Sequence, residues 1–214
     1  MVYAITKHTL GPIYRLWLRR INGLENLPKD GQFIIALNHA SYYETILPYI
    51  TILPKLNKQM HALVNSRYWK FLPARIIINW GKCIPVYVGK DSDPKKNEIA
   101  LKKAKKFLEM GHLIQIFPEG TRSNDGKLKK SHSGVARLAI MAKVPVVPVG
   151  IVGSDKVMPK GKIFPRFKRC EMNIGKPMHF NKYYNKKLNN KDFDKITRSI
   201  MKEIAKLIGQ EYNY

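Results

Sequence analysis

Short apolar runs recur along this chain, and a segment with helical periodicity separates most of them from the next. The runs cover residues 32–37, 61–64, 83–88, 113–117, 146–152 and 171–174. Strands of a parallel sheet are short and apolar throughout, because helices cover both faces of the sheet. The alternation of such strands with helices therefore predicts an α/β fold with a largely parallel central sheet flanked by helices.

Helical periodicity predicts helices over residues 45–53, 68–79, 94–110, 135–142 and 196–207. Pro94 suits the first turn of the third helix and Gly111 suits its end, since proline fits the first helical position and glycine often follows the last. Ligands of parallel sheets bind beyond the carboxyl ends of the strands. We therefore expect the functional residues in the loops that follow the strands.

The N-terminal segment has apolar and aromatic residues at helical spacing, with arginines between them: Leu10, Ile13, Tyr14, Trp17 and Ile21. This pattern predicts a basic amphipathic helix, which either packs on its own domain or lies on a membrane surface. With 214 residues, the chain has the length of one domain. We expect that domain to span residues 1–214, with a membrane-facing amphipathic helix in residues 1–22 and a C-terminal helix in residues 185–214.

The charge of the chain is strongly positive, with 39 Lys and Arg against 15 Asp and Glu and a formal net charge of +24. Such a surface attracts nucleic acid, an anionic membrane or an acidic carrier protein, although a lysine-rich proteome would also explain part of it. Hydrophobic residues make up 44%, which excludes an intrinsically disordered chain. Two cysteines, Cys83 and Cys170, are too few for a disulfide framework and fit a reducing compartment.

No run reaches the roughly 18–20 apolar residues that span a bilayer. The N-terminal residues also have no apolar block followed by a small-residue cleavage site. We therefore expect the protein to stay on the cytoplasmic side. The histidines show no metal-ligand spacing, so we expect no metal site.

One polar cluster follows the first predicted strand, at residues 38–44. His39 and Glu44 are five positions apart, so a turn between them would let the carboxylate hold one ring nitrogen while the other takes a proton from a hydroxyl. The alternative is a histidine that is hydrogen-bonded for structural reasons only.

A second cluster, Phe-Pro-Glu-Gly-Thr-Arg-Ser at residues 117–123, follows a later strand. Its turn presents Glu119, Thr121 and Arg122 together, and the guanidinium of Arg122 can bind a phosphate through two hydrogen bonds. Gly120 permits a tight turn or the close approach of a ligand. The alternative is an ordinary turn in which Glu119 and Arg122 pair with each other.

The two clusters, about eighty residues apart, together resemble the phospholipid and glycerol acyltransferase family that includes the 1-acyl-sn-glycerol-3-phosphate acyltransferases. Residues 21–28, INGLENLP, are similar to the family's lead-in before the histidine motif. Residues 134–139 and 144–149, GVARLA and VPVVPV, are similar to its last block. The resemblance covers residues from about 12 to about 180.

The resemblance implies an acyl transfer from acyl-coenzyme A or acyl carrier protein to the hydroxyl of 1-acyl-sn-glycerol-3-phosphate, which gives phosphatidate. It implies that His39 is the general base and Glu44 its orienting partner, and that Glu119, Gly120, Thr121 and Arg122 bind the acceptor's phosphate. Such a reaction needs no metal or redox cofactor. The implied partners are an anionic membrane surface, a lysophospholipid and the acyl donor, with the protein at the cytoplasmic face of the cell membrane.

The chain departs from the family pattern at two places. Glu44 stands where the family usually has Asp, although late acyltransferases of lipid A synthesis use either acid. The family also has an arginine near the end of the third strand, as in "GxIPVDR", whereas residues 83–90 here contain none. Lys90, two positions after the place of that arginine, is the candidate to substitute for it.

Three alternatives stay open. The same chemistry can act on another lysolipid or on glycerol 3-phosphate, and the chain can be a catalytically weak relative that binds lipid. A nucleic-acid-binding protein would also explain the charge, but the sequence has no helix-turn-helix, zinc-knuckle or aromatic RNA-binding signature. We therefore expect no specific nucleic acid partner.

Overall fold

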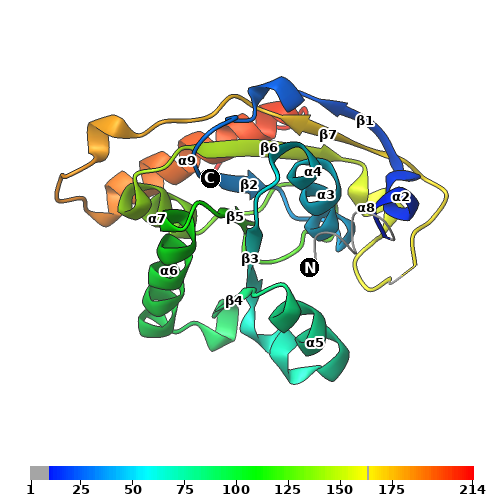
Figure 1. Cartoon of the computed structure of the whole chain (residues 1–214), viewed down its shortest axis with the longest axis horizontal. Helices are drawn as coiled ribbons and strands as arrows, with labels where there is room; N and C mark the ends of the chain where they lie inside the picture. The colour runs from blue at the N-terminus through cyan, green and yellow to red at the C-terminus, as the bar shows by residue number, and fades with distance from the viewer. Residues whose placement is uncertain (1–9, 163) are drawn as a thin grey trace.

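The seven strands that the structure describes form one sheet in the order β1-β7-β6-β2-β5-β3-β4 (Figure 1). The structure is a computed structural model and describes residues 10–162 and 164–214. Neighbouring strands are parallel, except β6 and β7, which are antiparallel. This confirms the predicted α/β fold with a largely parallel sheet. The strands are β1 (Leu18–Asn22), β2 (Ile34–Leu37), β3 (Met60–Asn65), β4 (Ile84–Val86), β5 (Leu113–Ile116), β6 (Val146–Val152) and β7 (Cys170–Ile174).

The five helices predicted from periodicity are present, and shorter helical turns join them. The α-helices are α2 (Leu10–Arg15), α3 (Tyr43–Thr51), α4 (Leu53–Leu56), α5 (Leu72–Trp80), α6 (Pro94–Glu109), α7 (Gly134–Ala142), α8 (Ser154–Val157) and α9 (Asn190–Leu207). The 3-10 turns are η1 (Leu24–Asn26), η2 (Ser66–Lys70), η3 (Gly89–Asp91) and η4 (Asn181–Tyr183). The helix predicted over residues 68–79 is divided, because η2 ends at Lys70 and α5 begins at Leu72.

The prediction of a helix through Ile21 is wrong in its second half. Helix α2 ends at Arg15, and Leu18–Asn22 is strand β1, which pairs in parallel with β7 at the edge of the sheet. Short helices are marginal by themselves, so hydrogen bonds to an open sheet edge outweigh helical propensity here. The part of the predicted helix in residues 1–9 lies outside the described residues.

Two hydrophobic cores lie on opposite faces of the sheet. Along β2, Ile34 and Ala36 face the core that α6, α7 and α9 cover, while Ile35 and Leu37 face the core that α3 covers. This alternation follows from the two-residue period of a strand. In Figure 1 the two groups of helices lie on either side of β2, β5 and β6. Among the described residues, no helix combines the length and the apolar character that crossing a bilayer requires.

Strand β2 lies between β5 and β6 and runs parallel to both. The loops that leave the carboxyl ends of these three strands therefore meet at one edge of the sheet. Residues 38–42 follow β2, residues 117–123 follow β5, and residues 153–154 follow β6. Both predicted polar clusters are in these loops.

Helix α9 packs directly on the backbone of β6 at Gly150. A Cβ atom at this position would lie 2.7 Å from Leu207 Cβ and 2.7 Å from Ile208 Cγ2, closer than packed carbon atoms can approach without movement of the helix. We expect Gly150→Ala to lower the free energy of unfolding by about 1–3 kcal/mol, measured by urea denaturation. Gly134→Ala is the control, since its added Cβ would meet nothing nearer than 3.9 Å. Equal stability of both variants would contradict this packing.

Candidate active site

Asn38 fixes the loop after β2 to the neighbouring strand. Its side-chain amide donates to the carbonyl of Ile151 at 3.0 Å, and its Oδ1 accepts from the Ile151 N–H at 2.8 Å. Asn38 is buried, so both bonds are shielded from water. This pair of bonds sets where the chain leaves the sheet just before His39.

His39 and Glu44 are in direct contact, as predicted. The distance from His39 Nδ1 to Glu44 Oε2 is 3.1 Å. An ionised carboxylate has no proton to donate, so Nδ1–H is the donor and Nε2 is left as the basic nitrogen. The ring of Phe117 stacks on His39 with centroids 3.9 Å apart, which further limits the ring's orientation.

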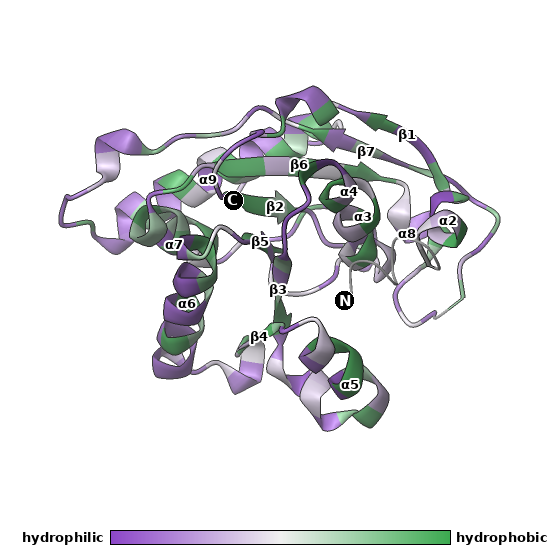
Figure 2. Cartoon of the chain, in the orientation of Figure 1, coloured by the Kyte–Doolittle hydropathy of each residue, from purple (hydrophilic) through white to green (hydrophobic). Residues whose placement is uncertain are grey.

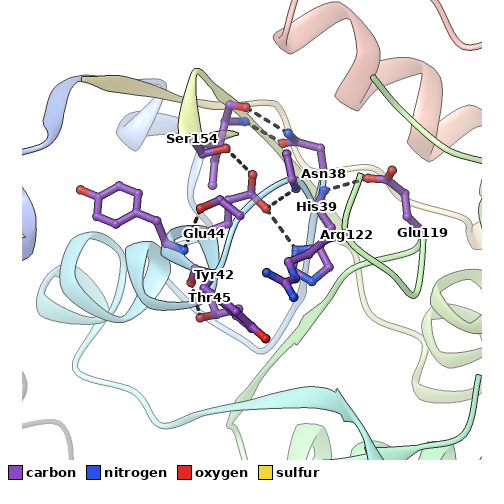
Figure 3. Close-up of polar contacts among 12 residues, drawn as sticks. Asn38, His39, Tyr42, Glu44, Thr45, Glu119, Arg122 and Ser154 are labelled. Carbon is purple, nitrogen blue, oxygen red and sulfur yellow. Dashed lines mark hydrogen bonds and ion pairs between the residues drawn. The ribbon is translucent and has the colours of Figure 1, made fainter. Parts of the chain in front are cut away.

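Glu44 is fully buried and collects three donors. Besides His39, its Oε2 accepts from the Ala40 N–H at 2.7 Å, and its Oε1 accepts from the hydroxyl of Ser154 (Figure 3). Glu44 also lies in the first turn of α3, where the helix dipole favours a negative charge. These contacts hold the carboxylate in place against His39.

Glu119 uses both carboxylate oxygens to bind backbone. Oε1 accepts from the His39 N–H at 2.7 Å, and Oε2 accepts from the Lys129 N–H at 2.8 Å. The alternative, in which Glu119 and Arg122 pair with each other, is wrong. Both side-chain oxygens of Glu119 accept from backbone N–H groups instead. Burial raises the pKa of Glu119 to about 7; the two N–H donors oppose the rise, and the charge of Glu44 adds to it.

Arg122 lies over the ring of Tyr42, with its guanidinium carbon 3.6 Å from the ring centroid (Figure 3). Arg122 is buried, and its Nη1 has no hydrogen-bond partner among residues 10–162 and 164–214. A buried guanidinium nitrogen without a partner is costly, and an anionic ligand would supply one. This geometry suits the predicted binding of a phosphate.

Two lysines that the sequence prediction missed accompany the turn. Lys129 Nζ donates to Thr121 Oγ1 at 3.1 Å, and Lys160 Nζ lies 3.4 Å from the carbonyl oxygen of Arg122. Lys129 follows the turn by only a few residues, whereas Lys160 comes from the loop after β6. Ser154 was missed as well, although a serine just after a predicted strand of a parallel sheet is a signal that could have pointed to it.

Gly120 has a positive φ of 68°, which favours glycine, and the side chains of His132 and Val88 pack against it. A Cβ atom on Gly120 would lie 3.5 Å from Val88 Cγ1. The end of the β4 segment is therefore beside the turn, and it presents valine there. Lys90, the possible substitute for the missing arginine, is exposed in η3.

The pKa of Glu119 predicts a specific pH dependence of stability. Since this pKa is above the ordinary value of 4.5, the folded state holds more protons between about pH 4.5 and 7, and the carboxyl's contribution to stability falls as the pH rises through that range. Glu119→Gln removes the titration and places an amide NH₂ against a backbone N–H, at a cost of about 1–3 kcal/mol.

We therefore expect native protein to be more stable than Glu119→Gln, by a margin that shrinks between pH 5 and pH 8. Urea denaturation of both proteins at the two pH values measures this margin. Glu109→Gln, on the exposed face of α6, is the control and should show no such change. A margin that grows with pH would show that Glu119 has a low pKa instead.

The chain is similar to known acyltransferases. The family model described as "Acyltransferase" matches residues 19–152, which include both clusters. A Bacillus subtilis protein named 1-acyl-sn-glycerol-3-phosphate acyltransferase is 30% identical over 161 residues, which are 75% of this chain and 73% of that protein.

A chloroplastic protein of Brassica napus with the same name, BAT2, is 32% identical over 151 residues, 70% of this chain. This chain spans only 41% of that relative's length. The crystal structure of the 1-acyl-sn-glycerophosphate acyltransferase PlsC from Thermotoga maritima shares the fold, with a TM-score of 0.70, 22% identity, and coverage of 100% of this chain and 82% of that one. The match of the family model over most of the chain shows that this protein belongs to the acyltransferase family.

Proposed function

We propose that the protein transfers a fatty acyl group from a thioester donor, acyl-coenzyme A or acyl carrier protein, to the free hydroxyl of 1-acyl-sn-glycerol-3-phosphate. The product is phosphatidate, a precursor in phospholipid synthesis. The observation on which the proposal rests is the His39–Glu44 contact at the end of β2, next to the turn that holds Arg122. The names of the relatives in Bacillus subtilis and Brassica napus support the choice of acceptor.

The geometry suits general base catalysis by His39. Its Nε2 removes the proton of the acceptor hydroxyl as the oxygen attacks the thioester carbonyl carbon. The C–S bond then breaks, and the proton on His39 passes to the leaving thiolate. Glu44 keeps Nδ1 as the donor and stabilises the positive imidazolium between these two steps. This reaction changes no oxidation state and its base is a side chain, so the proposal includes no metal or redox cofactor.

The turn at residues 119–122 forms the proposed binding site for the acceptor's phosphate. Arg122 offers its unpartnered Nη1, and the Nζ atoms of Lys129 and Lys160 lie beside the same turn. Thr121 offers a hydroxyl, and Gly120 permits the tight turn through its positive φ, while His132 fills the space beside it. Glu119 acts through the backbone that it holds, since both of its oxygens are already occupied.

A different acceptor is the second candidate, and Val88 is the observation that favours it. Its side chain packs beside Gly120, near the end of the segment in which the family has an arginine. Lys129 and Lys160 compensate for that missing charge if the acceptor is 1-acyl-sn-glycerol-3-phosphate. Competition assays with glycerol 3-phosphate and with other lysolipids distinguish the two candidates.

We also propose that the protein works at the cytoplasmic face of the cell membrane as a peripheral or monotopic protein. The proposed acceptor is a lipid, and anionic lipids attract basic residues near their surface by roughly 1 kcal/mol each. The net charge of +24 supports this location.

The first test is acyl transfer to 1-acyl-sn-glycerol-3-phosphate, with acyl-coenzyme A and acyl carrier protein offered as separate donors. We expect product from the native protein, and a loss of about 10²–10⁴-fold in kcat for His39→Ala, because the base is removed. His179→Ala is the matched control, an exposed histidine outside the site. Equal activity of His39→Ala and native protein would exclude His39 as the base.

The length of Glu44 gives a second prediction. Its carboxylate reaches His39, Ala40 and Ser154 together, and shortening the side chain by one methylene group moves it away from at least one of them. We expect Glu44→Asp to lower kcat roughly 100-fold, since small misplacements of catalytic groups have effects of this size.

Glu44→Gln keeps the length of the side chain and removes the charge. We expect it to lower kcat at least roughly 100-fold, because the imidazolium that forms during the reaction loses its negative partner. For the shorter variant, Glu44→Asp, a gain of activity would instead show that the native His39–Glu44 pair is misaligned.

A further inference from the structure

Helix α5 places large apolar side chains in solvent. Nine residues long, it has no buried residue. Large side chains of the α5 surface are more than two-fifths exposed, and we call them the α5 patch: Phe71, Leu72, Ile76, Ile77 and Trp80. Ala74 and Ile78, which are less exposed, lie on the opposite side of the helix. Figures 1 and 2 show α5 at one end of the molecule, with strongly hydrophobic segments.

The charges around the α5 patch have one sign. Residues 45–90 contain seven Lys and Arg and no Asp or Glu. Four of these basic residues flank the patch in exposed positions: Arg67, Lys70, Arg75 and Lys82. By contrast, the exposed face of α6 mixes lysines with Glu98 and Glu109, which form ion pairs with Lys102 and Lys105. An apolar centre within a purely basic rim complements an anionic lipid surface.

A second aromatic and basic segment leaves the same edge of the sheet. Phe164 is 78% exposed, and Phe167 is also fully in solvent, in the loop after β6. Residues 156–170 contain six Lys and Arg and no Asp or Glu. Since β6 and β3 run in the same direction, this loop and the η2–α5 segment both start at carboxyl ends of strands.

Direct contacts connect both segments to the site. Tyr68, in the η2 turn just before α5, has its hydroxyl 3.1 Å from that of Tyr42, whose ring lies under Arg122. From the other segment, Lys160 donates to the carbonyl of Arg122. A bilayer in contact with the two segments would therefore lie beside the proposed phosphate-binding site.

We propose that the α5 patch, together with Phe164 and Phe167, docks on the surface of an anionic lipid bilayer. The side chains enter the boundary between headgroups and acyl chains, while the basic rim contacts lipid phosphates. This proposal rests on the proposed function, because it explains how a lipid acceptor reaches Arg122 without leaving the membrane. It assigns the docking surface to α5, a different element from the N-terminal helix that the sequence predicted to face the membrane.

Flotation with vesicles tests the proposal. We expect the native protein to float with vesicles of phosphatidylcholine mixed with phosphatidylglycerol, and to float less with phosphatidylcholine alone or in high salt. Ile76→Ser combined with Ile77→Ser should reduce the partition coefficient at least roughly tenfold, since two large side chains no longer enter the lipid. Phe164→Ser combined with Phe167→Ser should also reduce it.

The matched control combines Ile99→Ser with Met110→Ser on the α6 side. These side chains are 66% and 65% exposed, against 62% and 67% for Ile76 and Ile77. We expect the control to float like native protein. Melting curves of all variants verify that these exposed substitutions leave the fold intact.

A catalytic measurement separates docking from chemistry. With acceptor embedded in vesicles, Ile76→Ser/Ile77→Ser should transfer acyl groups at least roughly tenfold more slowly than native protein, as the partition coefficient falls. With a short-chain acceptor dissolved as monomer, the two should be equally active. If the native protein floats through α5 yet transfers no acyl group, docking stands and the proposed function fails.

The docking proposal is overturned if the α5 double variant floats as well as native protein. If the same variant also changes a native dimer into a monomer in size-exclusion chromatography, the patch covers a second copy of the chain instead.

Discussion

The backbone of His39 is held from both sides by the turn at residues 117–123, and the site depends on this junction. The His39 N–H donates to Glu119 at 2.7 Å, and the His39 carbonyl accepts from the Ser123 N–H at 2.6 Å. Two loops that are eighty residues apart in the chain thereby become one unit. Because the proposed base is in one loop and the proposed phosphate site is in the other, these two bonds set the distance between them. Movement of either loop would misplace the other.

The sequence indicated this junction only in outline. Apolar runs and helical periodicity predicted the main elements, because burial on both faces leaves a simple pattern in parallel strands. The meeting of residues 39 and 119–122 followed from the shared carboxyl edge. The role of Glu119 could not be predicted, because a carboxylate that binds two backbone N–H groups looks the same in sequence as one that faces a ligand. The strand at Leu18–Asn22 was also missed, since its partner β7 lies about 150 residues further on.

The structure explains how glutamate takes the place where the family usually has aspartate. Glu44 does not bind His39 alone: its carboxylate also accepts from the Ala40 N–H and from the Ser154 hydroxyl. These donors define a position for the two oxygens that a longer side chain can fill from the first turn of α3. The extra methylene is thus accommodated within a fully buried pocket, and the contact with His39 is kept at 3.1 Å. Ser154 begins α8 directly after β6, so a third strand end takes part in orienting the proposed base.

The positive charge is not a uniform lysine coat. Helix α6 pairs some of its lysines with glutamates, whereas residues 45–90 have no acid at all, and neither do residues 156–170. The η2–α5 part of the first segment and the loop before β7 both follow carboxyl ends of strands, at the edge where the site lies, and both contain exposed apolar side chains. A nucleic acid partner would need the charge but would gain nothing from isoleucines and phenylalanines held in solvent. The combination of the two at the edge beside Arg122 fits the proposed lipid surface, and it connects the proposed location of the protein to the proposed role of His39.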